Sequence, residues 1–231
     1  MISVLKWDSK FFNLKIGTIE IDKPGISELE EIEKQKKDNQ FDLLYLFFNE
    51  ANNTVLEWLE QRGVKLIDQK LTFFKNLDHL LTQNTCCIEK FVGAVTPRLL
   101  ALAIESGHKS RFNKDARLNA RFFDFYQLWI ENSVKREMAD EVLVSKHNGE
   151  ISGFVTLKKN NGIGSIGLIA VDENYRGMGI GKDLLTAADN WYIANNCTAA
   201  SVITQADNAE ACRLYTKGGY SILHSQYIFH Y

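Results

Sequence analysis

Proline is almost absent from the chain, with two residues among 231. Together with a hydrophobic content of 45%, this composition is typical of a folded protein with an ample core and argues against disordered linkers. No apolar run approaches the roughly 20 residues of a membrane-spanning helix, so we expect no membrane partner. Residues 1–8 lack the basic start and apolar centre of a signal peptide. These absences predict a cytoplasmic location.

Cysteine and net charge are also low. The four cysteines form no C-x-x-C pair: Cys86, Cys87, Cys197 and Cys212. This spacing predicts neither a zinc site nor a redox centre, and we interpret the four side chains as reduced thiols. The formal net charge is −2, whereas nucleic-acid-binding proteins usually present a basic face. We therefore expect neither a metal nor a nucleic-acid partner.

Glycines concentrate at 177–181, directly after an apolar run. Residues 166–171 are short, branched and bounded by turn-formers, as expected for a buried strand. After the glycines, apolar residues recur at helical spacing: Ile180, Leu184, Ala188 and Trp191. A strand, a glycine-rich turn and a helix together predict an anion site, because the first helical amides lack intrahelical partners and carry partial positive charge. Arg176 adds a planar donor fork.

Three phosphate-binding motifs compete for this stretch. A Walker loop requires glycine where Arg176 stands and Ser or Thr where Asp183 stands. The dinucleotide fingerprint requires glycine where Lys182 stands. The third motif, R-x-x-G-x-G, is matched by Arg176, Gly179 and Gly181. It resembles the acyl-CoA pyrophosphate loop of the GNAT N-acetyltransferase superfamily, with a plain glycine-rich turn as the alternative interpretation.

A second motif supports the same resemblance. Residues 208–220 are similar to the superfamily's N-x-x-A-x-x-x-Y-x-x-x-G-F/Y signature. The resemblance covers residues 85–231 and implies a GNAT acyl-CoA N-acyltransferase fold with a mixed, V-splayed central sheet. Before it, strands alternate with helices, which predicts a small α/β layer. We expect an α/β (α+β) protein with a small N-terminal α/β domain at 1–84, a boundary near Asn84, and a GNAT domain at 85–231.

Turn and cap residues predict the individual elements. We expect helices at about 27–37, from 53 or 54 to 63, at 97–106, after the glycine-rich turn, and after Asn208. Expected strands cover 41–48, 65–77, 88–94, 141–146, 151–157, 165–171, 200–204 and 220–231. Asn148-Gly149 and Asn161-Gly162 predict hairpin turns. Residues 108–115 are interpreted as a polar, basic loop with one exposed aromatic side chain.

The resemblance implies that acetyl-CoA is the co-substrate. Strands 165–171 and 200–204 would splay apart, and the pantetheine arm would pair with backbone on the first of them, as an added strand does. That backbone belongs to Leu168, Ile169, Ala170 and Val171. The pyrophosphate would bind the loop amides of Arg176, Gly177, Met178, Gly179, Ile180, Gly181 and Lys182. Asn208 would hold the pantetheine or order a water molecule.

Tyr215 is the candidate general acid. The leaving group is a thiolate, and the corresponding thiol has a pKa of about 8.5. A tyrosine hydroxyl near the sulfur, with an ordinary pKa of about 10, can protonate it. Tyr215 lies two helical turns after Asn208, so both share a face. The alternative is a half-buried tyrosine that packs its helix onto the sheet. Residues 165–171 contain no carboxylate to act as a base, and Glu173 and His108 are better interpreted as solvated.

A narrower resemblance concerns the acceptor. Residues 7–12, the Ser110-Arg111-Phe112 segment and the aromatic helix ending in Trp129-Ile130 resemble the dTDP-fucosamine acetyltransferases. Those dimeric enzymes acetylate the 4-amine of a dTDP-linked 4-amino-4,6-dideoxy sugar. The resemblance implies a small-molecule amine of that class as partner, and a homodimer. Arg111 would then pair with the diphosphate, and Phe112 or Tyr126 would stack on the thymine.

Other functions remain open on the sequence alone. One is a GNAT enzyme for a protein N-terminus, an aminoglycoside or a polyamine, although a basic segment at 108–115 disfavours the polyamine. Another is a non-catalytic acyl-CoA-binding sensor. The pairing of Asn208 with Tyr215 argues against a sensor, because binding alone does not require an acid.

Overall fold

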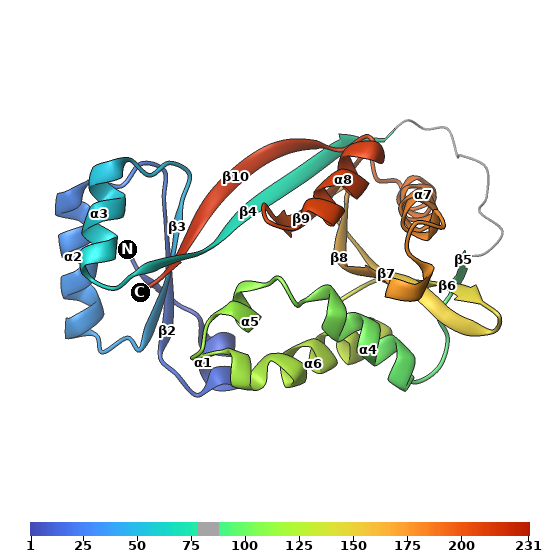
Figure 1. The fold of residues 1–231 in the computed structure, drawn as a ribbon, viewed down its shortest axis with the longest axis horizontal. Helices are drawn as coiled ribbons and strands as arrows, with labels where there is room; N and C mark the ends of the chain where they lie inside the picture. Colours follow the sequence, from blue (N-terminus) through green and yellow to red (C-terminus); the bar gives the residue numbers. More distant parts are fainter. Residues whose placement is uncertain (78–87) are drawn as a thin grey trace.

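The computed structural model describes residues 1–77 and 88–231. Within them, ten strands form one mixed sheet in the order β1-β2-β3-β10-β4-β9-β8-β7-β6-β5 (Figure 1). Helices cover both faces of the half that contains β6 to β9. The expected α/β fold with a mixed central sheet is confirmed.

The N-terminal layer comprises the elements β1 (Ser3–Val4), α1 (Lys6–Phe12), β2 (Ile16–Ile21), α2 (Ile26–Asp38), β3 (Leu43–Phe48) and α3 (Asn53–Gln61). β2 and β3 are parallel, and α2 and α3 share one hydrophobic core with them. Asn52 caps α3 by accepting a hydrogen bond from the Val55 amide at 3.0 Å, as its position before the helix predicts. Ser27, the cap that the sequence suggests for α2, lies inside the helix, which begins at Ile26 with Gly25 as its cap.

Two long antiparallel strands join this layer to the rest of the molecule (Figure 1). They are β4 (Lys65–Asn76) and β10 (Ser221–His230). The end of β10 lies between β3 and β4, so the last residues of the chain belong to the N-terminal layer. The expected boundary near Asn84, like Cys86 and Cys87, lies outside the described residues, and the division at 84/85 stays a prediction.

The second part of the molecule comprises β5 (Ile88–Lys90), α4 (Pro97–Ser106), α5 (Arg111–Lys114), α6 (Phe122–Val134), β6 (Glu141–His147), β7 (Glu150–Asn160), β8 (Ile163–Val171), α7 (Ile180–Ala194), β9 (Ala199–Gln205) and α8 (Ala209–Lys217). Single 3₁₀ turns lie at Asn119–Arg121 and Glu173–Tyr175. Consecutive strand residues supply opposite cores: Phe154 packs with α4 and α6, and Val155 packs with α7.

The turn signals are confirmed. Asn148 and Gly149 both have positive φ, and so do Asn161 and Gly162, which is the backbone of a two-residue hairpin turn. Thr96 caps α4 by accepting from the Leu99 amide at 3.2 Å.

Two local expectations are wrong. The strand expected over 88–94 ends at Lys90, ahead of Gly93, whose φ of +113° does not fit a strand. The loop expected at 108–115 contains the one-turn helix α5, because the amides of Asn113 and Lys114 turn back onto the Ser110 carbonyl.

Candidate active site

Strands β8 and β9 separate part-way along their length. Their parallel pairing runs from Ile163–Ala199 to Ile166–Val202 and then stops, although β8 continues to Val171 and β9 to Gln205. We call the opening that follows the β8/β9 wedge. The expected splay is therefore present, and it begins after the Ile166–Val202 pair.

A bulge in β8 lies where its pairing with β9 stops. The register of β7 against β8 shifts between Val155 and Leu157, and the Leu168 amide donates to the Thr156 hydroxyl at 2.8 Å. Beyond the bulge, residues 169–171 pair with β7 on one side only among the described residues. Their other edge borders the wedge, where an extended ligand could pair with it.

The glycine-rich loop joins the end of β8 to the start of α7. Gly177 and Gly179 have φ values of +78° and +87°, and a Cβ at either would contact no atom within 4 Å. Glycine is thus required there by backbone conformation rather than by packing. The amides of Gly177, Met178 and Gly179 donate to no described residue. This part of the loop therefore presents unpaired donors at the N-terminus of a long helix, as an anion site requires.

Arg176 is already engaged by acidic side chains. Its guanidinium bonds Glu105 of α4 and lies 3.8 Å from the Glu210 carboxylate, and its Nε donates to the Val171 carbonyl at 3.2 Å. A pyrophosphate would have to compete with two carboxylates for this side chain. The same contacts fix the loop against α4 and α8.

Tyr215 lies on the buried face of α8. It is 2% exposed, and its ring centroid lies 5.5 Å from that of Phe73. Burial raises the pKa of its hydroxyl well above the usual value, so the group stays protonated at neutral pH. The Asn208 side chain caps the helix by accepting from the Ala211 amide at 3.3 Å. Tyr215 therefore packs its helix onto the sheet and also remains a protonated donor.

Arg111 and Phe112 occupy α5, at the junction with the N-terminal layer. The Arg111 guanidinium lies 4.6 Å from the ring centroid of Tyr45 and 4.8 Å from that of Phe112. Phe112 stacks on Phe125 at 4.3 Å between centroids, and also on Phe12. The aromatic side chain expected to be exposed is thus half-buried, because residues distant in the sequence cover it.

Tyr126 lies in the core beneath α5. It is 4% exposed and stacks on Trp129 with centroids 5.8 Å apart. Its ring fills the space beside Gly107, where a Cβ would come within 2.1 Å. Tyr126 therefore packs in the core, and Phe112 is the less buried of the two rings.

The structure also brings in Asp68, which sequence analysis did not single out. This β4 residue is 7% exposed, lies 3.7 Å from the Lys114 ammonium, and has a pKa raised by burial. The β4–β9 pairing places it just beyond Gln205, where β9 ends. No local pattern marks it, since Asp68 occupies an ordinary position in a strand of mixed composition.

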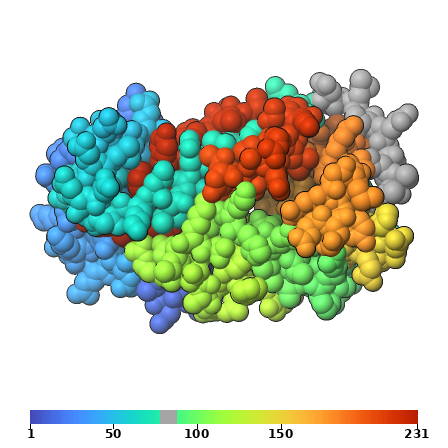
Figure 2. Space-filling view, viewed as in Figure 1, coloured from blue at the N-terminus to red at the C-terminus, as the bar shows by residue number. Residues whose placement is uncertain are grey.

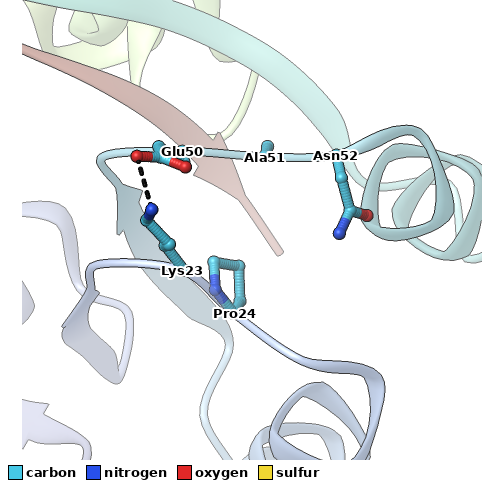
Figure 3. A pocket seen from close by; sticks show the side chains of 5 residues that line it. All are labelled: Lys23, Pro24, Glu50, Ala51 and Asn52. Atoms are coloured by element: carbon cyan, nitrogen blue, oxygen red, sulfur yellow. Dashed lines mark ion pairs between the residues drawn. The ribbon is translucent and has the colours of Figure 1, made fainter.

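A shallow hollow lies elsewhere, between the loops that follow β2 and β3. It is lined by Lys23, Pro24, Glu50, Ala51 and Asn52 (Figure 3). Its one ion pair, Lys23 with Glu50 at 2.9 Å, is exposed to solvent. The hollow belongs to the N-terminal layer and is separate from the wedge (Figure 1).

Within residues 1–77 and 88–231, no group of three or more His, Cys, Asp or Glu side chains could hold a metal ion. Over the same residues, none of the helices combines the length and apolar character that a bilayer crossing requires.

Comparisons with known proteins point to one family. Residues 107–220 match the model of the acetyltransferase (GNAT) family. The spore coat polysaccharide biosynthesis protein SpsD of Bacillus subtilis is 28% identical over 136 residues, which cover 58% of this chain and 47% of that protein. Streptothricin acetyltransferase of Escherichia coli is 31% identical over 74 residues, covering 32% of this chain and 42% of that protein. The match thus spans less than half the length of each of these relatives.

Two solved structures share the fold over most of the chain. A conserved protein of unknown function from Staphylococcus epidermidis has a TM-score of 0.63 at 18% identity, covering 93% of this chain and 82% of that one. A GCN5-related N-acetyltransferase from Sphaerobacter thermophilus has a TM-score of 0.56 at 17% identity, covering 89% and 66%. At these identities the likeness concerns the fold alone.

Proposed function

Since residues 107–220 match the model of the acetyltransferase (GNAT) family, we propose that the chain transfers the acetyl group of acetyl-CoA to the amine of a small molecule. The observation that carries this proposal is the β8/β9 wedge, followed directly by the glycine-rich loop. The wedge exposes strand backbone that can pair with the pantetheine amides. The loop offers unpaired amides at the start of α7, which suit the pyrophosphate.

The acceptor amine attacks the thioester carbonyl carbon directly. A nitrogen–carbon bond forms, the carbon–sulfur bond breaks, and the nitrogen loses one proton while the sulfur gains one. Tyr215 is proposed to supply the proton to sulfur, because it occupies the tyrosine position of the motif at 208–220 and packs in the same core cluster as Ile169 and Val171 of the wedge. Asp68 is proposed to accept the proton of the amine through water, because it is a buried carboxylate near the wedge. Much of the rate enhancement then comes from holding amine and thioester together.

The proposed acceptor is a dTDP-linked 4-amino-4,6-dideoxy sugar, acetylated at the 4-amine. The three stretches that carry the narrower resemblance, residues 7–12, 110–112 and 122–130, meet in one aromatic cluster. Trp7 contacts Phe125, and Phe12 and Phe125 both stack on Phe112. Arg111, beside this cluster, is proposed to bind the diphosphate. The likeness to a protein named for polysaccharide biosynthesis agrees with a sugar acceptor. We also propose that the chain forms a homodimer.

A second acceptor class has its own support. The likeness to streptothricin acetyltransferase, at 31% identity over 74 residues, favours an amine-bearing antibiotic. Such an acceptor requires the same wedge and the same Tyr215, and differs in what Arg111 contacts.

The experiment is thiol release from acetyl-CoA with a panel of amines. The panel contains dTDP-4-amino-4,6-dideoxy-galactose and -glucose, streptothricin, an aminoglycoside, spermidine and a peptide with a free N-terminus. Rapid release with one dTDP-sugar alone is the expected result. Release only with another amine would retain the acetyltransferase and reject the sugar. No release with any amine, despite measurable acetyl-CoA binding, would favour the sensor interpretation and remove the catalytic role of Tyr215.

A further inference from the structure

Arg111 differs from the other arginines in the part of the chain that the structure describes. Six of them bond a carboxylate: Arg62, Arg98, Arg117, Arg121, Arg136 and Arg176. Arg213 is exposed to solvent. Arg111 is half-buried, has a fully buried Nε without a hydrogen-bond partner, and lies within 4 Å of no described carboxylate. A cation withdrawn from water without a partner is costly, so its position requires an explanation.

Aromatic rings take the place of a carboxylate. The Arg111 guanidinium carbon lies 4.6 Å from the ring centroid of Tyr45, 5.4 Å from that of Phe47 and 4.8 Å from that of Phe112. Tyr45 and Phe47 belong to β3 of the N-terminal layer, and Phe112 follows Arg111 on α5. We call these three rings the Arg111 cage. Rings stabilise a guanidinium through their faces and leave its nitrogens available to bind an oxyanion.

Contacts with β10 and with the end of α5 hold the Arg111 cage in place. Tyr45 is fully buried and stacks on His230 of β10, with centroids 4.7 Å apart. His230 in turn bonds the Asp115 carboxylate at 2.6 Å, and Arg117 bonds the same carboxylate at 2.8 Å. β3, β10 and the end of α5 are thereby fixed relative to one another. In the space-filling view, the green segment with α5 and α6 lies against the cyan and red segments (Figure 2).

The hydroxyl of Tyr45 is buried and has no hydrogen-bond partner of ordinary geometry among the described residues. It lies near the Asp8 carboxylate, whose pKa burial raises and this hydroxyl helps to lower. Tyr45 contacts Arg111 through its ring, so the ring is the part of this side chain that the cage requires.

We propose that the N-terminal layer forms part of the acceptor site, with Tyr45 and Phe47 as positioning residues that hold Arg111 for an oxyanion on the acceptor. In line with the proposed function, on which this step rests, the oxyanion is the diphosphate of a nucleotide sugar. The carboxylates of Asp8 and Asp68 act on Arg111 only from beyond ion-pair distance and do not occupy its nitrogens.

The test is calorimetric titration of dTDP into the protein saturated with CoA. Tyr45→Leu removes the ring, and Tyr45→Phe keeps it. Trp58→Leu is the matched control, since Trp58 is a buried aromatic of the same layer with Arg62 3.7 Å above its ring. We expect about tenfold weaker dTDP binding for Tyr45→Leu and Phe47→Leu, and unchanged binding for Tyr45→Phe and Trp58→Leu. The acetyl-CoA affinity should be the same in all five proteins.

Every other outcome would contradict either the Arg111 cage or the proposed substrate. Equal dTDP binding by Tyr45→Leu and the wild type would overturn the cage, as would an equal loss in Trp58→Leu or no dTDP binding by the wild type. Cage-dependent dTDP binding without acetylation of any dTDP-sugar would retain this inference and reject the proposed substrate. Acetylation of a dTDP-sugar with a KM unaffected by Tyr45→Leu would retain the proposed substrate and reject the role of the Arg111 cage.

Discussion

The two regions proposed to act in catalysis are assembled in different ways. The wedge, the glycine-rich loop and α8 come from one nearly continuous stretch, residues 163–217. The junction around Arg111 gathers side chains from α1, β3, β4, α5 and β10, from Asp8 to His230. The first region supplies Tyr215 and, above all, backbone: amides and a strand edge that are unpaired among the described residues. The second works through buried charges and rings, which only the folded chain brings together.

The largest expected effect concerns the chemical step at the wedge. Tyr215→Phe should lower kcat by about 100-fold, the lower end of the usual gain from general acid catalysis, with the acetyl-CoA KM unchanged. Tyr192→Phe is the control, because that tyrosine is also fully buried and its hydroxyl has no hydrogen-bond partner in the described part of the chain. Steady-state kinetics of thiol release measure both. A Tyr215→Phe enzyme with wild-type kcat would leave this residue with a packing role alone.

The corresponding change at the junction is Arg111→Ala. It should raise the KM for a dTDP-sugar by about 10- to 100-fold, the usual value of hydrogen bonds to a charged group, and leave the acetyl-CoA KM unchanged. Arg213→Ala removes an exposed arginine and serves as the control. Initial rates with each substrate varied in turn give both constants. If Arg111→Ala shifted both KM values equally, the separation of the two regions would be wrong.

The glycine-rich loop offers a matched pair of backbone changes. Gly179 and Gly149 have φ values of +87° and +86°, and a Cβ would contact nothing within 4 Å at either. Alanine should cost about 1–2 kcal/mol of stability at both positions, because both require left-handed backbone. Only Gly179→Ala should raise the acetyl-CoA KM, by about tenfold, since Gly149 lies in the β6–β7 hairpin. Thermal unfolding measures the loss of stability, and steady-state kinetics measure the acetyl-CoA KM. Equal KM values for Gly179→Ala and Gly149→Ala would exclude the loop from cofactor binding.

The smallest expected effect is a pH dependence of stability at the junction. Burial lowers the pKa of His230, although its bond to Asp115 opposes that shift. Between this lowered pKa and the ordinary value of about 6.5, the unfolded chain binds a proton that the folded chain does not. The free energy of unfolding should therefore fall as the pH drops below about 6.5, by at most about 1.4 kcal/mol per unit.

His230→Gln keeps a donor near Asp115 and removes the titration. Urea unfolding at pH 7.5 and 5.5 should show a smaller loss for this variant than for the wild type. The low pKa of Asp115 adds no slope here, because its stabilisation is lost only below about pH 4. Equal losses of unfolding free energy in the two proteins would show that protonation of His230 does not destabilise the fold.

The elements were predictable wherever a local signal was strong. Thr96-Pro97 marks the start of α4, and Asn148-Gly149 marks a hairpin, because each fixes the backbone through its own residues. The one-turn helix α5 carries no such signal, and its burial depends on Phe12 and Tyr45, far away in the sequence. For the same reason, the sequence predicts an exposed Phe112 and offers Phe112 or Tyr126 as the stacking residue, whereas Phe112 is half-buried and the Tyr126 ring fills the space beside Gly107.

Local pattern predicts the order of strand, glycine-rich loop and helix, the family resemblance, and Tyr215 as the candidate acid. These depend on short-range rules: backbone dihedrals, helix caps and residue spacing. Three features emerge only in the folded chain: β10 returns between β3 and β4, the β8–β9 pairing stops after Ile166, and Arg111 lies among the rings of β3. Strand pairing and burial join residues as far apart as Leu44 and Tyr231, and no local pattern encodes which of them will meet.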